Sequence, residues 1–290
     1  SLIPAALIPS SFVTITLLIY FPLSCCFPSA YNVVGGYHMI NDYLNLSARE
    51  DVIILDSVDS TNTYMLNRIK SDPPASGALT VVSDRQTGGR GRFTRSFYSP
   101  SGTGIYMTYA FRSNLDEKSL LSVTPVTAAL LHQELSAYSD SPLRIKWVND
   151  LYNDSGKIAG ILTELLDVDG SRWIVIGAGI NVLKPADLPS ELRDVIGNLA
   201  KKASRDEIAC RMHDAFARVF RPDAVSLPSM HEYYTRNCLS IGRHVTVRNT
   251  NGDSYEAQSI DINDSYALVV VPSGSDSAVT VFSGEVSVSV

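Results

Sequence analysis

The sequence predicts an α+β domain over residues 42–237, followed by a small all-β domain over residues 240–290. In the first region, short apolar and β-branched runs alternate with amphipathic helical patterns. From Ile241 the pattern changes to short alternating runs separated by turn residues, and Asn251-Gly252 is a strong hairpin signal. The length of 290 residues is sufficient for one large domain and one small one.

The individual elements of the larger domain follow from periodicity, capping residues and breakers. Strands are expected at residues 51–55, 79–83, 105–111, 144–148, 158–166 and 173–180. Helices are expected from the capping residues at 59–62 to about Lys70, over 120–138, and over 204–220. The helix over 120–138 contains Pro125, which is tolerated only near a first turn. The helix over 204–220 opens with a capping box, Ser-Arg-Asp-Glu.

Residues 1–40 differ in composition from the rest of the chain. The apolar run over residues 11–27 is interrupted by Pro22 and is short for a membrane span. A secretory signal needs a basic start, yet the first Lys or Arg is Arg49. Met39 begins a stretch typical of a cytosolic N-terminus. We therefore expect residues 1–40 to be a leader or a non-native extension that the folded protein does not need.

Composition excludes several classes of function. Hydrophobic residues make up 45% and charged residues 19%, as in an ordinary globular protein. The net charge of −6 gives no global basic field for nucleic acid, so any chemistry on anions needs a local basic cluster. The four cysteines have no metal-ligand spacing and are expected to be reduced thiols, which weakly favours a reducing compartment: Cys25, Cys26, Cys210 and Cys238.

A basic cluster does occur at residues 86–95, Q-T-G-G-R-G-R-F-T-R. Its glycines allow the backbone to approach a ligand closely, and arginine side chains bind carboxylate and phosphate oxygens in a bidentate way. The segment is not a phosphate-binding Walker loop, because the Lys-Ser/Thr ending is missing. Taken alone it is equally well read as a solvated basic loop or an RGG-like nucleic-acid contact.

Three further motifs lie on predicted strands. Residues 144–152, R-I-K-W-V-N-D-L-Y, place Asn149 and Asp150 where a strand ends. The two side chains could orient a nucleotide or help hold Mg²⁺, or they could simply form an Asx turn. Residues 156–164, G-K-I-A-G-I-L-T-E, place Lys157 at the start of an apolar strand, facing an anion or water. Residues 176–181, I-G-A-G-I-N, leave room for a ligand or another backbone, but lack the final glycine of a dinucleotide-binding motif.

The order of these motifs is more specific than any one of them. Ser60-Thr61-Asn62, then Q-x-x-G-R-G-R, K-W-x-N-D, G-K-I-A-G-I-L-x-E and I-G-A-G-I-N, resembles the bacterial biotin–protein ligase family. The resemblance covers residues 56–181 and resumes at residues 283–287, S-G-E-V-S, which look like the family's closing strand. It implies a mixed β-sheet flanked by helices, similar to class II aminoacyl-tRNA synthetases, with a small C-terminal SH3-like β-barrel.

The resemblance also implies an activity and a set of site residues. The enzyme would activate biotin with ATP and Mg²⁺ to biotinyl-5′-AMP and transfer biotin to a lysine of a biotin carboxyl carrier protein. The resemblance assigns catalysis to Lys157 and Arg92. It assigns biotin binding to Ser60, Thr61, Asn62, Gln86, Arg90, Gly91, Arg92, Lys157 and Gly160. It assigns ATP binding to Arg95, Asn149, Asp150 and Asn181. It implies no metal site that the protein forms alone.

Two departures and several alternatives accompany this interpretation. The family commonly has Pro where this chain has Val148, and often Gly where it has Thr94. Nothing before Asp51 offers two amphipathic helices or basic recognition residues, so the monofunctional type without a DNA role is expected. We expect no membrane association and a cytoplasmic location, and leave a homodimer open. The alternatives are a lipoate–protein ligase, which shares the fold and the chemistry, and a non-catalytic biotin-binding module.

Overall fold

The structure is a computed structural model, and it describes residues 33–34, 42–49, 51–93, 95–199, 204–219, 226–249 and 252–288. The predictions about the N-terminal extension and about Thr94 fall almost entirely outside these residues. Within the described part of the chain, no helix combines the length and the apolar character needed to cross a membrane.

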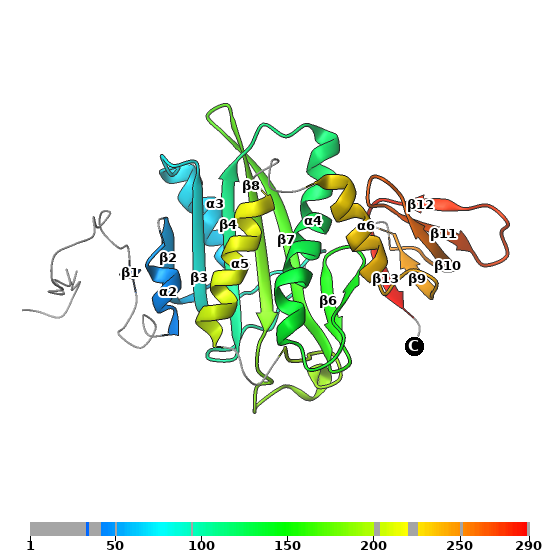
Figure 1. The fold of residues 1–290 in the computed structure, drawn as a ribbon, viewed down its shortest axis with the longest axis horizontal. Helices are drawn as coiled ribbons and strands as arrows, with labels where there is room; N and C mark the ends of the chain where they lie inside the picture. Colours follow the sequence, from blue (N-terminus) through cyan, green and yellow to red (C-terminus); the bar gives the residue numbers. More distant parts are fainter. Residues whose placement is uncertain are drawn as a thin grey trace, which may run out of the picture. The chain divides into compact units, whose positions relative to one another are not determined.

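The larger of two sheets has eight strands in the order β1-β2-β3-β4-β8-β7-β6-β5 (Figure 1). The first three strands are parallel and every other pairing is antiparallel, so the sheet is mixed as predicted. Its strands are β1 (Val33–Val34), β2 (Val52–Val58), β3 (Ala78–Gln86), β4 (Gly104–Arg112), β5 (Arg144–Lys146), β6 (Asp150–Asn153), β7 (Gly156–Val168) and β8 (Ser171–Asn181).

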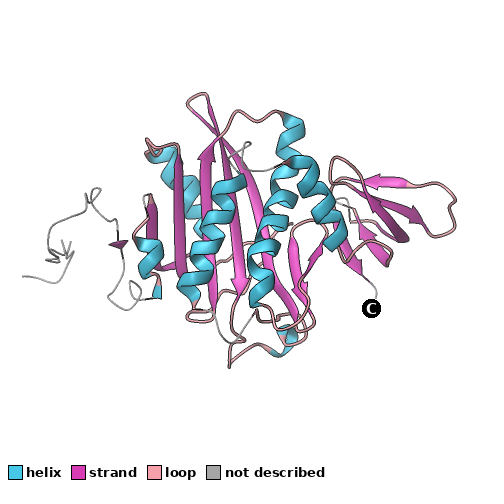
Figure 2. Ribbon diagram, in the orientation of Figure 1, coloured by secondary structure: helices cyan, strands magenta, loops and turns pink. Residues whose placement is uncertain are grey.

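Helices cover both faces of this sheet because its central strands are apolar on both sides (Figure 2). On one face, Met65 and Ile69 of α3 pack against Ile53 and Val81. On the other face, α4 and α5 cover the neighbouring positions Ile54 and Val82 among others. The helices are α2 (Leu44–Ser47), α3 (Thr61–Ser71), α4 (Glu117–Leu135), α5 (Arg205–Val219) and α6 (Leu227–Asn237), with 3-10 turns at Ser136–Tyr138 and Ser190–Leu192.

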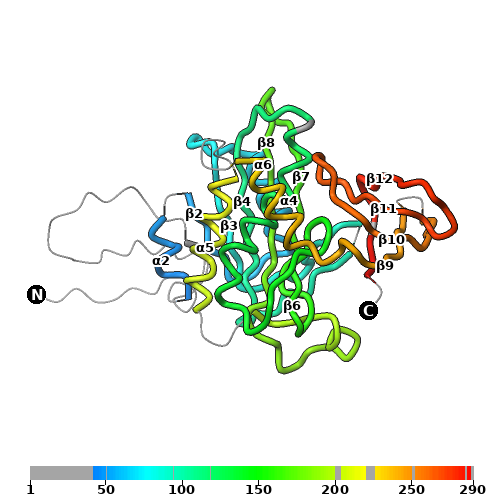
Figure 3. Tube along the Cα trace, turned by 45° about the vertical axis from the view of Figure 1, so that its right-hand side comes forward, coloured from blue at the N-terminus to red at the C-terminus, as the bar shows by residue number. Residues whose placement is uncertain are grey.

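The second sheet contains five antiparallel strands in the order β12-β11-β10-β9-β13. They are β9 (His244–Arg248), β10 (Ser254–Ile262), β11 (Leu268–Pro272), β12 (Val279–Val281) and β13 (Glu285–Val288). The strands β9 and β10 form the expected hairpin, although Asn251 of its turn lies outside the described residues. The second sheet lies beside the β5–β6 end of the larger sheet, where Trp147 Nε1 donates to Tyr266 O in the turn between β10 and β11 (Figure 3). This all-β region agrees with the small SH3-like domain expected at the C-terminus.

Two local predictions about the larger sheet are wrong. The helix α4 begins at Glu117, where the Asp116 side chain accepts a hydrogen bond from Ser119 N at 2.8 Å, so Pro125 lies in the third turn and not near the first. The predicted strand over 144–148 ends at Lys146, because residues 147–149 form a turn and Asp150 starts the antiparallel strand β6. Asn149 therefore lies in a tight turn, not at a strand end.

The helix α6 was not predicted from the sequence. A usable signal was present, because Ser226 precedes the helix and Pro228 occupies its first turn. Its buried Tyr234 packs edge-on against Tyr266, in the turn between β10 and β11, at 5.4 Å between ring centroids. The helix thus connects the two sheets both in sequence and through side-chain packing.

Candidate active site

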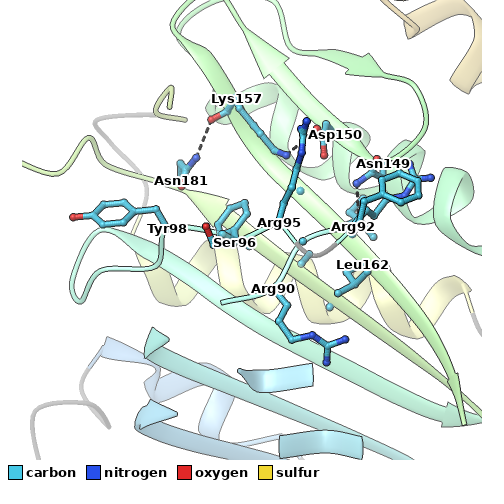
Figure 4. A pocket seen from close by; sticks show the side chains of 18 of the residues that line it. Arg90, Arg92, Arg95, Ser96, Tyr98, Asn149, Asp150, Lys157, Leu162 and Asn181 are labelled. Atoms are coloured by element: carbon cyan, nitrogen blue, oxygen red, sulfur yellow. Dashed lines mark hydrogen bonds and ion pairs between the residues drawn. The ribbon is translucent and has the colours of Figure 1, made fainter. Parts of the chain in front are cut away.

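One pocket of about 260 Å³ collects the motif residues at the end of the larger sheet. It lies where β3 ends, β7 begins and β8 ends, and the loop that follows β3 lies across it (Figure 4). All of the residues assigned to the site by resemblance line it: Ser60, Thr61, Asn62, Gln86, Arg90, Gly91, Arg92, Arg95, Asn149, Asp150, Lys157, Gly160 and Asn181.

The polar floor of the pocket is the first turn of α3. Ser60 is the N-cap residue, and its hydroxyl oxygen accepts from Thr63 N. The side chain of Gln86 fixes this turn from β3, since its Oε1 accepts from Thr61 N at 2.9 Å and from Thr61 Oγ1 at 3.1 Å. The amide nitrogen of Gln86 donates to Ser99 Oγ at 3.0 Å. A strand end and a helix start are thereby held as one rigid polar surface.

Asn62 is 4% exposed and sits beside a glycine on β8. Its Oδ1 lies 2.6 Å from Thr108 Oγ1, and its Nδ2 donates to Glu164 Oε2 at 2.8 Å. A Cβ atom on Gly177 would lie 1.9 Å from Asn62 Oδ1. The glycines at 176–181 were expected to leave room for a ligand or a backbone; at 177 the space is occupied by the Asn62 side chain.

The glycine- and arginine-rich loop is held to the pocket by two of its arginines. Arg90 forms an ion pair with Glu164, 2.5 Å between Nη2 and Oε1, and donates from Nη1 to Thr63 Oγ1 at 3.3 Å. Arg92 donates to Asn149 Oδ1 at 3.1 Å. Figure 4 shows the two side chains leaving the loop in different directions, with Arg92 toward the 147–149 turn and Arg90 away from it.

Lys157 projects from the start of β7 into the side of the pocket that Asp150 occupies. Its Nζ lies 2.8 Å from Asp150 Oδ2 and 5.9 Å from the centroid of the Phe97 ring. The backbone carbonyl of Lys157 accepts from Asn181 Nδ2 at 2.9 Å, which joins β7 to the end of β8. These contacts fix a compact positive charge where an anionic ligand can reach it.

Tyr152 lines the same side of the pocket. Burial, and to a lesser extent the nearby Asp150 carboxylate, raise the pKa of its phenol to about 12, while Arg95 acts in the opposite direction. The hydroxyl therefore stays protonated at neutral pH and can donate a hydrogen bond to a ligand.

The 147–149 turn is held from behind by residues near the C-terminus. The Trp147 indole nitrogen donates to Tyr266 O at 2.8 Å, and Tyr234 Oη donates to Val148 O at 3.2 Å. Ser240 Oγ accepts from Trp147 N at 3.1 Å. Three residues of the closing segment complete the pocket wall: Gly284, Val286 and Ser287.

Several contributing residues were not given roles from the sequence. Glu164 was visible in the G-K-I-A-G-I-L-x-E motif, but its partners Arg90 and Asn62 come from distant segments. Thr108 is a polar residue in an otherwise apolar strand. Its side chain is fully buried, and a buried hydroxyl needs a hydrogen-bond partner. Phe97 follows the basic loop, and its ring fills the space above Gly179, where a Cβ would lie 2.4 Å from the ring.

No cluster of three or more His, Cys, Asp or Glu side chains able to hold a metal ion occurs among the described residues. One oxygen of the site is nevertheless suited to a cation. Asp150 Oδ1 is buried and has no hydrogen-bond partner in the described structure, while Oδ2 pairs with Lys157. An oxygen in this position fits a hard divalent cation that brings most of its own ligands.

Sequence comparisons identify the family. The profile of the biotin/lipoate A/B protein ligase family matches residues 54–181. The bifunctional ligase/repressor BirA of Bacillus spizizenii is 30% identical over 233 residues, which cover 75% of this chain and 69% of that protein. The chain belongs to the biotin protein ligase family. The biotin–[acetyl-CoA-carboxylase] ligase of Mycobacterium tuberculosis is 26% identical and covers 73% of this chain and 79% of its own length.

Solved structures of this family share the fold. The biotin protein ligase from Aquifex aeolicus in complex with biotin and ATP superposes with a TM-score of 0.66 at 24% identity. The match covers 83% of this chain and 99% of that one. The fold class expected from the motif order is confirmed.

Proposed function

We propose that the protein activates biotin with ATP to biotinyl-5′-AMP and transfers biotin to a lysine of a biotin carboxyl carrier protein. Membership of the family and the names of its relatives support this function. The observation that carries it is the position of Lys157 in the same pocket as two arginines of the glycine-rich loop, Arg92 and Arg95.

The first half-reaction brings two anions together. The biotin carboxylate attacks the α-phosphorus of ATP, the bond between the α-phosphorus and the bridging oxygen breaks, and pyrophosphate leaves. Lys157 and Arg92 are proposed to neutralise the repulsion and the charge that develops in the transition state. Their partners Asp150 and Asn149 hold both cationic side chains in place before the ligands bind.

The proposed roles of the other residues follow their position in the pocket. Near the α3 turn, Ser60, Thr61, Asn62 and Gln86 supply the donors and acceptors that a ureido ring and a carboxylate chain require. Gly160 leaves space beside Lys157, since a Cβ there would lie 3.1 Å from Lys157 Nζ. On the opposite side, Arg95, Asn149, Asp150 and Asn181 are proposed to face the nucleotide.

Mg²⁺ would be held mainly by the ATP phosphates, with Asp150 as the side chain best suited to assist. When bound, the ion would withdraw charge from the phosphate oxygens. In the same state, Asp150 would be shared between the ion and Lys157, so its carboxylate orients both positive groups.

The loop is proposed to protect the adenylate. Biotinyl-5′-AMP is a mixed anhydride that water hydrolyses, so the site must exclude water until the acceptor arrives. The neutral amine of the acceptor lysine then attacks the carbonyl carbon, AMP leaves with its electron pair, and a proton is released. The loop residues Arg90, Gly91 and Arg92 lie over the pocket in a position to close it.

We further propose that residues 42–237 form the catalytic domain and residues 240–290 the C-terminal domain. The two sheets and the connecting helix α6 support this division. A cytoplasmic location, the absence of a DNA-binding role and a homodimer stay predictions from the sequence.

The decisive experiment is pyrophosphate exchange into ATP, run with biotin, with lipoate and with neither acid. Exchange with biotin alone is expected. Exchange with lipoate alone would transfer the chain to the lipoate ligases, and no exchange with either acid would indicate a binding module without catalysis.

A further inference from the structure

Glu164 connects the glycine-rich loop to the deepest part of the pocket. It lies on β7, and its side chain is 22% exposed. Its Oε1 accepts from Arg90 Nη2 at 2.5 Å, and its Oε2 accepts from Asn62 Nδ2 at 2.8 Å. One carboxylate therefore joins Arg90 of the loop to Asn62 of α3.

The hydrogen bonds continue beyond Asn62 into the α3 turn. Asn62 Oδ1 and Thr61 Oγ1 lie 2.6 Å and 2.8 Å from Thr108 Oγ1, and Thr61 Oγ1 donates to Gln86 Oε1. A ligand that contacts Asn62 or Thr61 therefore contacts the far end of a chain of hydrogen bonds that ends at Arg90. Polar chains of this kind hold their members in one arrangement when every member is satisfied.

Charge balance gives Arg90 a role different from that of Arg92. A free carboxylate at position 164 would repel the two anionic ligands of the pocket. The ion pair with Arg90 compensates this charge, so the Arg90 guanidinium is occupied by Glu164. Arg92 instead donates to the neutral side-chain oxygen of Asn149.

We propose that Glu164 is a positioning residue that holds the glycine-rich loop over the biotin pocket through its ion pair with Arg90. This inference rests on the proposed function. In this role Glu164 does not contact the reacting atoms. Arg90 is the loop residue that it binds. Neutralising either partner releases the loop, so the enzyme forms the adenylate but loses it to solvent.

The test compares Glu164→Gln with wild type in a single-turnover assay that separates adenylate formed from adenylate retained. Gln keeps an acceptor for Asn62 but removes the charge that attracts Arg90. We expect adenylate to escape about ten-fold faster, the size expected for one lost charge-assisted hydrogen bond. The KM for biotin and the rate of adenylation are expected to change by less than about three-fold, within the usual spread of such effects.

Asp167→Asn is the matched control. Asp167 lies on the same strand and also pairs with an arginine, Arg172, but that pair is exposed next to the turn that joins β7 and β8. This variant is expected to retain the adenylate as wild type does. Equal escape from the Glu164→Gln and Asp167→Asn variants would overturn the proposal.

A double-mutant cycle tests whether the two partners act together. Escape from Glu164→Gln/Arg90→Gln is expected to be no faster than from the worse single variant, because both remove the same latch. Multiplicative effects would show two independent roles and overturn the latch.

A second readout does not depend on catalysis. Trypsin cleavage after Arg90, Arg92 or Arg95 of the ligand-free chain, followed by mass spectrometry, should be faster in Glu164→Gln than in wild type or Asp167→Asn. If wild type forms no adenylate, the proposed function fails and the latch with it. If wild type retains adenylate and Glu164→Gln changes neither escape nor cleavage, the latch alone fails.

Discussion

Nζ of Lys157 lies 2.8 Å from Oδ2 of Asp150, and the two side chains are 23% and 18% exposed. The main cation of the pocket is thus paired before any substrate binds. An incoming carboxylate or phosphate must share Lys157 with Asp150, which keeps the ammonium group at a fixed position at the start of β7.

Replacing Lys157 by Ala should reduce adenylation by roughly 10²–10³-fold, as for the loss of one preorganised charged donor. The loss has two parts, because the variant also leaves the Asp150 carboxylate unpaired where two anions meet. Biotin-dependent pyrophosphate exchange measures the effect, and circular dichroism checks the fold. Lys184→Ala, in the segment after β8, is the control and should keep full exchange. Near-normal exchange by Lys157→Ala would remove this residue from the catalytic assignment.

Replacing Arg92 by Gly should release the adenylate and cause indiscriminate labelling of lysines. The variant loses the contact between the loop and Asn149, which fixes the loop to the 147–149 turn. Incubation with biotin, ATP and a bystander protein, followed by detection of biotin on that protein, measures the leak. An adenylate retained as long as in wild type would contradict the role of this arginine in closing the loop.

Replacing Gly177 by Ala should weaken biotin binding while the protein still folds. The added Cβ would lie 1.9 Å from Asn62 Oδ1, so the Asn62 side chain must turn away from Thr108 and Glu164. We expect the Kd for biotin, measured by calorimetry, to rise at least about ten-fold, the equivalent of one lost buried hydrogen bond. Gly88→Ala is the control, since its Cβ would meet only an ordinary contact at 3.5 Å. Equal affinities for the two variants would show that the position of Asn62 does not matter.

The free energy of unfolding should fall as the pH is lowered from 7 toward 5. Burial lowers the pKa of His132, whose Nε2 donates to Leu143 O while Nδ1 accepts from Tyr233 Oη. Because the native pKa lies below the unfolded value of about 6.5, the unfolded chain binds more protons between the two values. Stability is therefore fully present above about pH 6.5 and is lost as the pH falls through the native pKa. Urea unfolding at several pH values should show a shallower slope for His132→Gln. An unchanged slope would contradict this origin.

A chain that begins at Met39 should fold and keep its activity. Several side-chain contacts that hold the N-terminal region to the body of the protein lie after this point. Asp206 accepts from Asn45 N and Leu46 N, and Arg205 pairs with Asp42 at 2.5 Å. The two-residue strand β1 would be lost from the sheet edge, so a small drop in melting temperature is expected. Aggregation or inactivity of the shortened chain would show that the segment before Met39 is needed.

Elements with strong local signals were predicted well. The helix α5 runs from Arg205 to Val219 against an expected 204–220, and Ser204 Oγ caps it as the Ser-x-x-Glu pattern indicates. The second half of that capping box was not predictable. The carboxylate of Glu207 accepts from Tyr138 Oη instead of turning back to the helix start, and this partner lies 69 positions away.

The site was predictable as a set of residues, but its pairings were not. Motif order assigned Lys157 and Asp150 to one site but did not pair them. The register of β6 and β7 sets Lys157 opposite Tyr152 and Asp150 opposite Gly160, so the ion pair forms only because the Lys157 side chain extends along the strands toward Asp150. The same holds for Glu164, which sequence reasoning left without a role because both of its partners are distant. Contacts across strands depend on register and on side-chain rotamers, and neither is encoded in a local pattern.

Gly284, Val286 and Ser287 form one wall of the pocket, so the pocket is complete only after nearly the whole chain has been synthesised. A ribosome produces the basic loop and the lysine of β7 more than one hundred residues before the strand that completes the pocket, since 284 minus 157 is 127. Until that strand has emerged and paired with β9, a nascent chain has the charged groups but lacks one side of the enclosure. A partly synthesised chain that formed the acyl phosphate would therefore lose it to solvent, so retention of the adenylate begins only after almost the whole chain has been made.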